Sequence, residues 1–260
     1  MTSMPSRTLL RIVVVLFPLA ASACAPDPGR LSGRVIAPAS ENPNTPIRMT
    51  ADPACLAMHA DAPAMQDVLL RSADGGLANA FVYLKGTFPA APVPATPIEI
   101  DQRGCLYRPR VQGARVGQGL KVRSSDELLH SIRGRSGAGN DFALSQPHAG
   151  MVGDATLKHA EVMLRVRCDV HNWMRAYIGV VDHPYFAVSD PDGRFALESV
   201  PPGTYTLVAW HEVLGTREYP VEITTKGDIR VDVDLGKPPA SAALQLPVED
   251  IVVHAEHGAS

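Results

Sequence analysis

The feature that most constrains the fold is a short alternating segment that ends at a cysteine. From residue 162 to residue 168, apolar side chains and Cys168 take one parity, and both arginines of the segment take the other. A period of two is typical of a half-buried β-strand, and it directs Cys168 into the same interior as the apolar residues. Further along the chain, turn-forming glycines, prolines and aspartates recur at intervals of about ten residues, as in antiparallel sheets. The sequence therefore predicts an all-β fold with Cys168 inside it.

The loop after this strand carries candidate metal ligands. Its spacing is Cys168-x2-His171-x2-Met174, and His130 lies upstream on a second predicted strand. A thiolate, two imidazoles and a weak thioether suit Cu(I) and Cu(II) about equally, which limits rearrangement when an electron is transferred. We therefore predict one type 1 copper ion bound by His130, Cys168, His171 and Met174.

Other chemistries explain these residues less well. A closed zinc site prefers more than one cysteine or an acidic ligand. A c-type haem needs C-x-x-C-H, which the chain lacks, and a binuclear copper centre needs a second cysteine in the loop. Copper oxidases and reductases need a further copper site, and the sequence has no second dense histidine cluster, so we do not expect an enzyme. His148 and His159 lie in a polar stretch and are predicted to be solvated.

The first residues of the chain predict export. Arg7, Arg11, an apolar stretch over residues 9–21 and small residues at 21–23 are together typical of a secretory signal peptide rather than of a membrane span. Cys24 follows directly, so lipid attachment at Cys24 and a soluble form are both open. We expect a bacterial protein in the periplasm or anchored at the outer membrane.

Charge and cysteine number narrow the partners and the compartment. Without residues 1–23, 22 basic and 27 acidic residues remain, which is a formal charge of −5. This balance argues against a nucleic-acid partner, which would favour a basic patch. With Cys24 at the signal junction and Cys168 assigned to copper, Cys55 and Cys105 remain for a disulfide, which an exported chain can keep. The alternative is that both are buried thiols.

Composition divides the chain into several parts. Residues 68–70 are a strand candidate, and a proline-rich linker at 89–97 cannot continue a sheet because each proline removes a donor. A long polar excursion occupies residues 134–156, and turn signals recur at 190–193 and 200–203. The predicted organisation is a signal peptide (1–23), an N-terminal β segment (31–90), a copper domain (96–181), a second β unit (182–236) and a flexible tail (237–260).

Residues 98–181 resemble the cupredoxins. The resemblance rests on Cys105–Val111, which is similar to their early strand, on the hydrophobic-glycine turn at Val116–Val122, and on the ligand loop, whose spacing is similar to that of the amicyanins. It implies a Greek-key barrel of eight strands with copper at one end. It also implies that His171 lies nearest the surface, so that electrons enter at His171, with Trp173 beside it.

Residues 183–235 resemble the carboxypeptidase regulatory-like domain, a prealbumin-type antiparallel β-sandwich. The resemblance is carried by Phe186–Phe195 and Val200–Leu207. The glycines and prolines in these segments form tight turns, so they indicate a fold and not a chemistry. Two histidines of this part, His183 and His211, are predicted to have structural roles.

This second unit is short for such a domain, and its missing strands have candidates far upstream. Gly33–Val35 resembles the usual first strand, and Gly75–Leu84 resembles the next. We therefore hypothesise one sandwich interrupted by an inserted copper barrel. The hypothesis requires residues 33–37 or 80–84 to pair with the sheet that contains residues 205–210.

Three functions are compatible with these features. The first is an exported type 1 copper protein that carries single electrons in the bacterial cell envelope to an unidentified redox partner protein. The second is storage or delivery of Cu(I), which suits a site loosened by Ser131, where the cupredoxins commonly have an asparagine. The third is an envelope scaffolding or glycan- or partner-binding β protein in which the barrel is vestigial.

Overall fold

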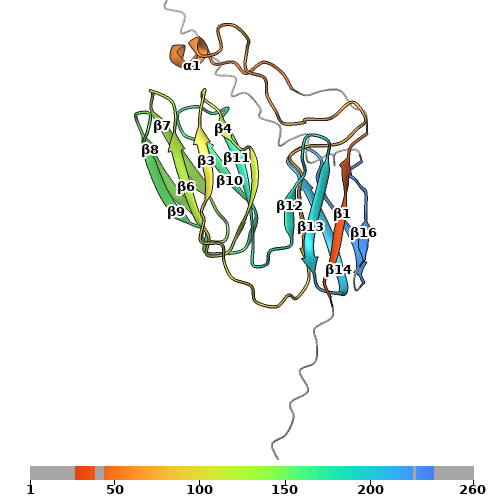
Figure 1. Cartoon of the computed structure of the whole chain (residues 1–260). Coiled ribbons are helices and arrows are strands. Elements are labelled where there is room, and N and C mark those ends of the chain that lie inside the picture. Colours follow the sequence, from red (N-terminus) through yellow and green to blue (C-terminus); the bar gives the residue numbers. More distant parts are fainter. Residues whose placement is uncertain (1–26, 39–43, 225–226, 237–260) are drawn as a thin grey trace, which may run out of the picture.

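The computed structural model describes residues 27–38, 44–224 and 227–236, and their regular structure is almost entirely β (Figure 1). The predicted all-β fold is confirmed. Within these ranges helix is limited to α1 (Pro53–Ala57), and no helix is long and apolar enough to cross a membrane. The predicted signal peptide, Cys24 and the tail from residue 237 lie outside the described residues.

Two sheets form a barrel between residues 98 and 181. Its strands are β3 (Ile98–Gln102), β4 (Tyr107–Arg108), β5 (Val111–Arg115), β6 (Gly119–Ser124), β7 (His130–Arg135), β8 (Phe142–Gln146), β9 (Val152–Thr156), β10 (Glu161–Cys168) and β11 (Arg175–Val181). One sheet has the order β5-β11-β10-β7-β8, and the other has the order β4-β3-β6-β9. β5 pairs with β11 and β3 pairs with β6 in parallel, whereas the other neighbours are antiparallel.

The alternation in β10 sets the direction of its side chains. Leu164, Val166 and Cys168 are buried in the barrel core, and the two arginines between them are exposed. Val162 is 40 % exposed, because the register with β11 shifts between Glu161 and Leu164. The predicted inward direction of Cys168 is therefore confirmed, and that of Val162 is wrong.

A β-sandwich lies beside the barrel (Figure 1). Its strands are β1 (Gly29–Ile36), β2 (Phe81–Lys85), β12 (Phe186–Val188), β13 (Arg194–Val200), β14 (Gly203–His211), β15 (Gly215–Ile223), β16 (Asp228–Arg230) and β17 (Val233–Asp234). One sheet has the order β12-β2-β14-β15, and the other has the order β13-β1-β16, with β17 also paired to β1. Apolar residues from both sheets form a core separate from that of the barrel.

The two sheets combine strands from both sides of the barrel in the sequence. β2 pairs antiparallel with β14, with Val82 opposite Ala209 and Leu84 opposite Leu207. β1 pairs antiparallel with β13, with Leu31 opposite Leu197. The chain therefore begins the sandwich, forms the barrel, and returns to complete the sandwich. This is the pairing that the hypothesis of an interrupted sandwich required.

Two segments differ from the sequence-based expectation. Residues 68–70 form no strand, because the Asn44 side-chain oxygen accepts the backbone N–H groups of Val68 and Leu69, each at 3.1 Å. These bonds replace the ladder partners that a strand would need. The polar stretch 134–156 contains two strands, β8 and β9, which close the barrel on its more exposed side.

Candidate metal centre

Three of the four predicted ligands come together at one end of the barrel. His130 begins β7 and Cys168 ends β10, and these strands are neighbours, with Cys168 opposite Ile132. His171 lies in the loop that follows β10. Met174, at the end of that loop, is fully buried in the barrel core. The fold thus places a thiol, two imidazoles and a thioether in one region.

Backbone hydrogen bonds fix the ligand loop. The N–H of Met174 donates to the carbonyl of His171 at 3.0 Å, and the N–H of Cys168 donates to the carbonyl of Met174 at 3.3 Å. The N–H of Asp169 donates to the carbonyl of Ser131 at 2.8 Å, which joins the loop to β7. Ser131 therefore braces the loop through its backbone.

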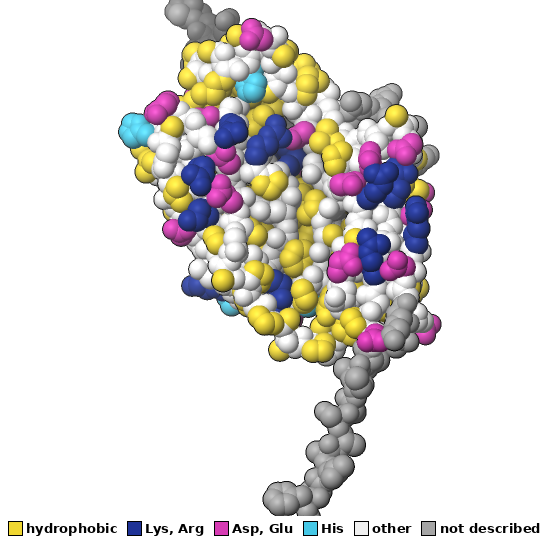
Figure 2. Space-filling view, in the orientation of Figure 1, with side chains coloured by type: hydrophobic (Ala, Val, Ile, Leu, Met, Phe, Trp, Pro, Cys, Tyr) yellow, Lys and Arg dark blue, Asp and Glu magenta, His cyan; other side chains and the backbone are white. Residues whose placement is uncertain are grey.

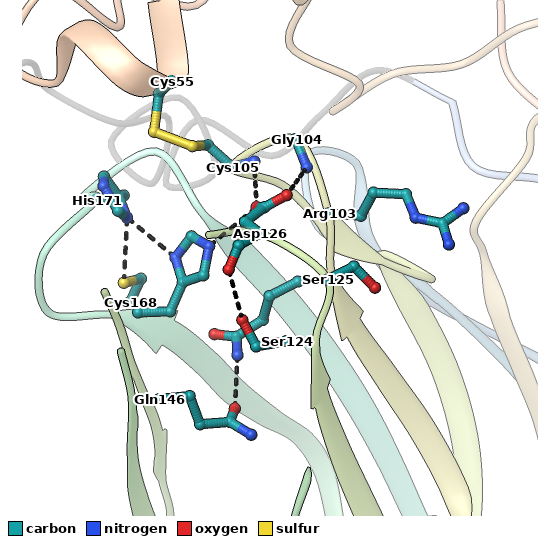
Figure 3. A network of polar contacts seen from close by, with 12 residues as sticks. Cys55, Arg103, Gly104, Cys105, Ser124, Ser125, Asp126, Gln146, Cys168 and His171 are labelled. Atoms are coloured by element: carbon teal, nitrogen blue, oxygen red, sulfur yellow. Dashed lines mark hydrogen bonds and ion pairs between the residues drawn. A yellow bond between two sulfur atoms is a disulfide. The ribbon is translucent and has the colours of Figure 1, made fainter. Parts of the chain in front are cut away.

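The side chains of Cys168 and His171 point toward each other (Figure 3). Nδ1 of His130 lies 3.2 Å from Nδ1 of His171, and Sγ of Cys168 lies 3.6 Å from the same Nδ1 of His171. One ligand atom from each of the three residues lies within 4.8 Å of the others, and all three side chains are buried. The arrangement is a compact set of two nitrogens and one sulfur.

Each imidazole is held from behind by a carboxylate. Nε2 of His130 lies 3.0 Å from Oδ2 of Asp126, and Nε2 of His171 lies 3.0 Å from Oδ2 of Asp52. Because a carboxylate accepts a hydrogen bond, each Nε2 carries a proton, and in a neutral ring the lone pair then lies on Nδ1. Such an outer carboxylate fixes the tautomer and the ring orientation of a metal-binding histidine.

This arrangement tests whether the residues fit a metal. Two Nδ1 lone pairs and a sulfur at close range repel one another unless a cation, either a proton or a metal ion, lies among them. The donor set is that of a soft or borderline metal, since it combines one thiolate with two imidazoles. The residues therefore fit copper, with His130, Cys168 and His171 as candidate ligands and Met174 next to them in the loop.

The electrostatics favour a thiolate. Burial alone would raise the pKa of Cys168, but hydrogen bonds from His130 and His171 lower it to about 5. Burial lowers the pKa of His130, yet Asp126 and Cys168 outweigh it and bring the pKa to about 8. The pKa of His171 is raised in the same way, because Cys168 and Asp52 outweigh burial. A negative sulfur with two partly positive imidazoles is the state in which a metal ion can replace protons.

The predicted disulfide between Cys55 and Cys105 is present, and it lies next to this centre (Figure 3). The backbone N–H of Cys105 donates to Oδ2 of Asp126 at 2.9 Å, and that of Gly104 donates to Oδ1 at 2.7 Å. Trp173 donates from Nε1 to the carbonyl of Cys105 at 3.0 Å. The disulfide therefore supports the carboxylate behind His130 as well as the tryptophan beside His171.

The position of His171 differs from the expectation. His171 was expected to lie nearest the surface, but it is only 1 % exposed, because Asp52 and the residues around α1 lie over it. The imidazole is therefore buried, not at the surface as the resemblance implies, while its role in electron entry stays a prediction. Trp173 is only partly buried, and its ring centroid lies 5.2 Å from that of His171.

Sequence reasoning missed three residues of the centre. Asp126 and Asp52 each accept a hydrogen bond from the outer nitrogen of an imidazole, and Tyr107 is buried in the same core cluster as Cys168. Burial and the nearby Cys168 raise the pKa of Tyr107. A carboxylate four residues before His130 is a local signal for Asp126. Asp52 precedes Pro53, which is typical of a helix start, but nothing local connects it to His171.

Four further histidines, His148, His159, His183 and His211, lie where the sequence predicts them. His148 and His159 are exposed. His183 and His211 are buried, and their Nδ1 atoms accept the backbone N–H groups of Tyr185 and Val213 at 3.2 and 3.3 Å. These two residues are structural in the part of the chain that the structure describes.

Comparisons with known proteins give similarity at the level of solved structures. No protein-family profile matches the chain, and no curated protein sequence matches it. A copper-containing nitrite reductase from Thermus scotoductus SA-01 is 17 % identical, with 36 % of this chain and 24 % of that chain covered and a TM-score of 0.31. A methionine-to-alanine mutant of amicyanin in the Cu(I) form is 19 % identical, with 38 % of this chain and 97 % of that chain covered and a TM-score of 0.29. A second such mutant is 21 % identical, with 39 % and 98 % covered and a TM-score of 0.29. The matched part of the chain thus spans about a quarter of the nitrite reductase.

Proposed function

We propose that this protein binds one copper ion and carries single electrons. The observation that supports this most strongly is the convergence of Nδ1 of His130, Nδ1 of His171 and Sγ of Cys168, with both outer nitrogens held by carboxylates. When bound, copper supplies a one-electron couple that a thiolate and two imidazoles stabilise in both states. Met174 would supply the weak thioether ligand.

The protein's own part in this function is to keep the ligands from moving. Electron transfer is fast when the ligands rearrange little, and the bonds from Asp169 to Ser131 and from Met174 to His171 hold the loop at both ends. Asp126 and Asp52 hold the imidazole rings. Trp173, which contacts His171 and is partly exposed, is our candidate for the point where electrons enter.

The compartment and the partner belong to the same proposal. A disulfide persists in oxidising compartments, so the Cys55–Cys105 bond supports an exported, envelope-located protein. Figure 2 shows basic and acidic side chains interspersed over the sandwich, where Arg30 pairs with Glu198 and Arg34 with Asp74. This mixture of charges is unlike the basic patch that a nucleic acid favours, and we propose a redox protein of the envelope as the partner.

The test is visible absorption of the full chain after addition of Cu(II). We expect an intense thiolate-to-copper charge-transfer band that is lost in Cys168→Ser and strongly changed in His130→Gln. His159→Gln is the matched control, because His159 is exposed and lies just before β10, at the opposite end of this strand from Cys168. A colourless protein with Cu(II), or a band that survives in Cys168→Ser, would contradict the assignment.

A second function, storage or delivery of Cu(I), is favoured by one specific observation. His171 is covered, so no ligand edge of the centre faces a partner directly. Cyclic voltammetry separates the two functions. Fast, reversible one-electron exchange supports the carrier, whereas a protein that binds Cu(I) tightly but gives no reversible wave supports storage.

A further inference from the structure

The end of the barrel that holds the candidate ligands is covered by a loop that precedes the barrel in the sequence. We call residues 46–65 the cap loop. Its two ends are joined, because Pro46 and Met65 form an isolated bridge and the N–H of Ile47 donates to the carbonyl of Ala64 at 2.7 Å. In Figure 1 the loop, with α1 at its tip, lies over the ends of β7 and β4.

The inner face of the cap loop is part of the barrel core. Met49 is 2 % exposed and Cys55 is fully buried, and both belong to the same apolar cluster as Cys168. Ile47 and Ala64 pack against this cluster. Burial of these side chains gives the loop a defined closed position.

Asp52 connects the cap loop to the candidate ligands. Its Oδ1 accepts the N–H groups of Ala54 and Cys55 at 2.9 and 3.2 Å, which caps the start of α1. Its Oδ2 accepts Nε2 of His171 at 3.0 Å. The two oxygens of one carboxylate thus tie the helix to the imidazole.

The disulfide connects the carboxylates that hold the two imidazoles. Cys55, the third residue of α1, is bonded to Cys105, and the N–H of Cys105 donates to Asp126, which holds His130. Both outer carboxylates are therefore anchored to the two halves of one disulfide. Figure 3 shows Cys55 on the loop above Cys105, with His171 and Asp126 close by.

We propose that the cap loop is a disulfide-anchored cover that retains the metal, and that Asp52 is the positioning residue through which it acts on His171. This inference rests on the proposed function, which supplies the metal. A solvent-borne chelator or a second protein can reach the centre only after the cap loop moves, so the bound metal exchanges slowly. The electron path to the surface then runs past Trp173 and not through an exposed edge of His171.

One variant separates the two roles of Asp52. In Asp52→Asn the remaining oxygen can still accept from Ala54 and Cys55, but the amide nitrogen cannot accept the Nε2 proton of His171. The double variant Cys55→Ser/Cys105→Ser removes the anchor. Asp61→Asn is the matched control, because Asp61 is an exposed carboxylate in the same cap loop.

The first measurement uses the metal-free full chain. Alkylation of Cys168 by iodoacetamide, read by mass spectrometry of the peptide that contains it, reports whether the cap loop is closed. We expect alkylation at least tenfold faster in the double variant than in the wild type, and an unchanged rate in Asp61→Asn. An equal rate in the double variant and the wild type overturns the cover.

The second measurement uses the copper-loaded protein and a chelator. We expect loss of the charge-transfer band at least tenfold faster in the double variant. In Asp52→Asn we expect a shifted band and, by ¹⁵N NMR of the metal-free protein, a changed chemical shift of Nε2 of His171, because this nitrogen loses its carboxylate acceptor. A wild-type Nε2 shift together with a wild-type band in Asp52→Asn overturns the positioning role.

The two measurements also separate this inference from the proposed function. If neither the wild type nor any variant forms a charge-transfer band, the copper function fails. The alkylation rates still decide whether the cap loop covers Cys168. If the band forms but chelation and alkylation are equally fast in all variants, the cover fails and the copper function stands.

Discussion

At the scale of single residues, His211 is a buried histidine that the candidate metal centre does not use. It lies at the end of β14 and is 1 % exposed. Burial, with a smaller effect of the nearby Arg110, lowers its pKa to about 3. In the unfolded chain a histidine has a pKa of about 6.5. The native protein therefore keeps His211 neutral over a pH range in which the unfolded chain protonates it.

The sign of the resulting pH dependence follows from proton binding. Below about pH 6.5 the unfolded state binds one more proton than the native state, so the free energy of unfolding falls as the pH falls. The loss approaches about 1.4 kcal/mol per pH unit and ends near the folded pKa. We expect this contribution to disappear in His211→Asn.

The measurement is urea unfolding of wild type and His211→Asn between pH 7 and pH 4, without metal. Other groups affect both proteins alike, so the difference between the two curves isolates His211. The difference in the free energy of unfolding between the wild type and His211→Asn should narrow steadily as the pH falls. Two parallel curves would contradict the prediction. His148→Gln, at an exposed histidine, should track the wild type.

At the scale of elements, the disulfide joins the cap loop to the barrel. It links Cys55 and Cys105 across 50 residues. A disulfide that closes a loop of this length stabilises a protein by about 4 kcal/mol, because it lowers the entropy of the unfolded chain. We expect Cys55→Ser/Cys105→Ser to lower the free energy of unfolding by up to this amount, measured by denaturant titration. An unchanged midpoint in the double variant would mean that the disulfide does not stabilise the folded chain.

The elements that sequence alone predicts are those whose signal is local. Alternation in β10 and the spacing of the ligand loop place Cys168, His171 and Met174 without any tertiary information. A carboxylate from the cap loop is different, since Asp52 is 119 residues from His171 and follows no repeating pattern. Its place depends on the disulfide and on burial of Met49, which only the folded chain reveals.

Burial of His171 escaped prediction for the same reason. The ligand loop carries the signal for metal binding, but the cover comes from a segment before the barrel. Likewise, β8 and β9 are polar strands with only weak alternation, so their sequence is typical of a loop. Pairing with β7 and β6 makes them strands.

At the scale of the whole molecule, the barrel and the sandwich share an apolar and a charged contact. Phe81 of β2 is fully buried in a cluster with Val111 and Val181 of the barrel. Arg110 donates to both carboxylate oxygens of Glu212 at 2.6 and 2.9 Å and to Asp67 at 2.7 Å. A half-buried arginine with two carboxylates fixes orientation, whereas the apolar contact supplies most of the stabilisation.

Two glycines of the barrel make this contact possible. Gly113 of β5 and Gly179 of β11 lie opposite each other in the sheet. A Cβ at Gly179 would lie 2.4 Å from the ring of Phe81, and a Cβ at Gly113 would lie 2.3 Å from the ring of Phe186. Both rings belong to the sandwich, so the absence of side chains on the barrel lets the two units pack closely.

Gly179→Ala should therefore loosen the contact between the two units without touching the candidate ligands. Because overpacking at a tight contact costs about 1–3 kcal/mol, we expect a lower midpoint of thermal unfolding and a split of the calorimetric transition into separate barrel and sandwich transitions. Gly137→Ala is the matched control, since no atom lies within 4 Å of a Cβ placed there, and it should unfold like the wild type. If Gly179→Ala keeps a single transition at the wild-type temperature, Phe81 has room to move, and the two units are not held together by close packing at this glycine.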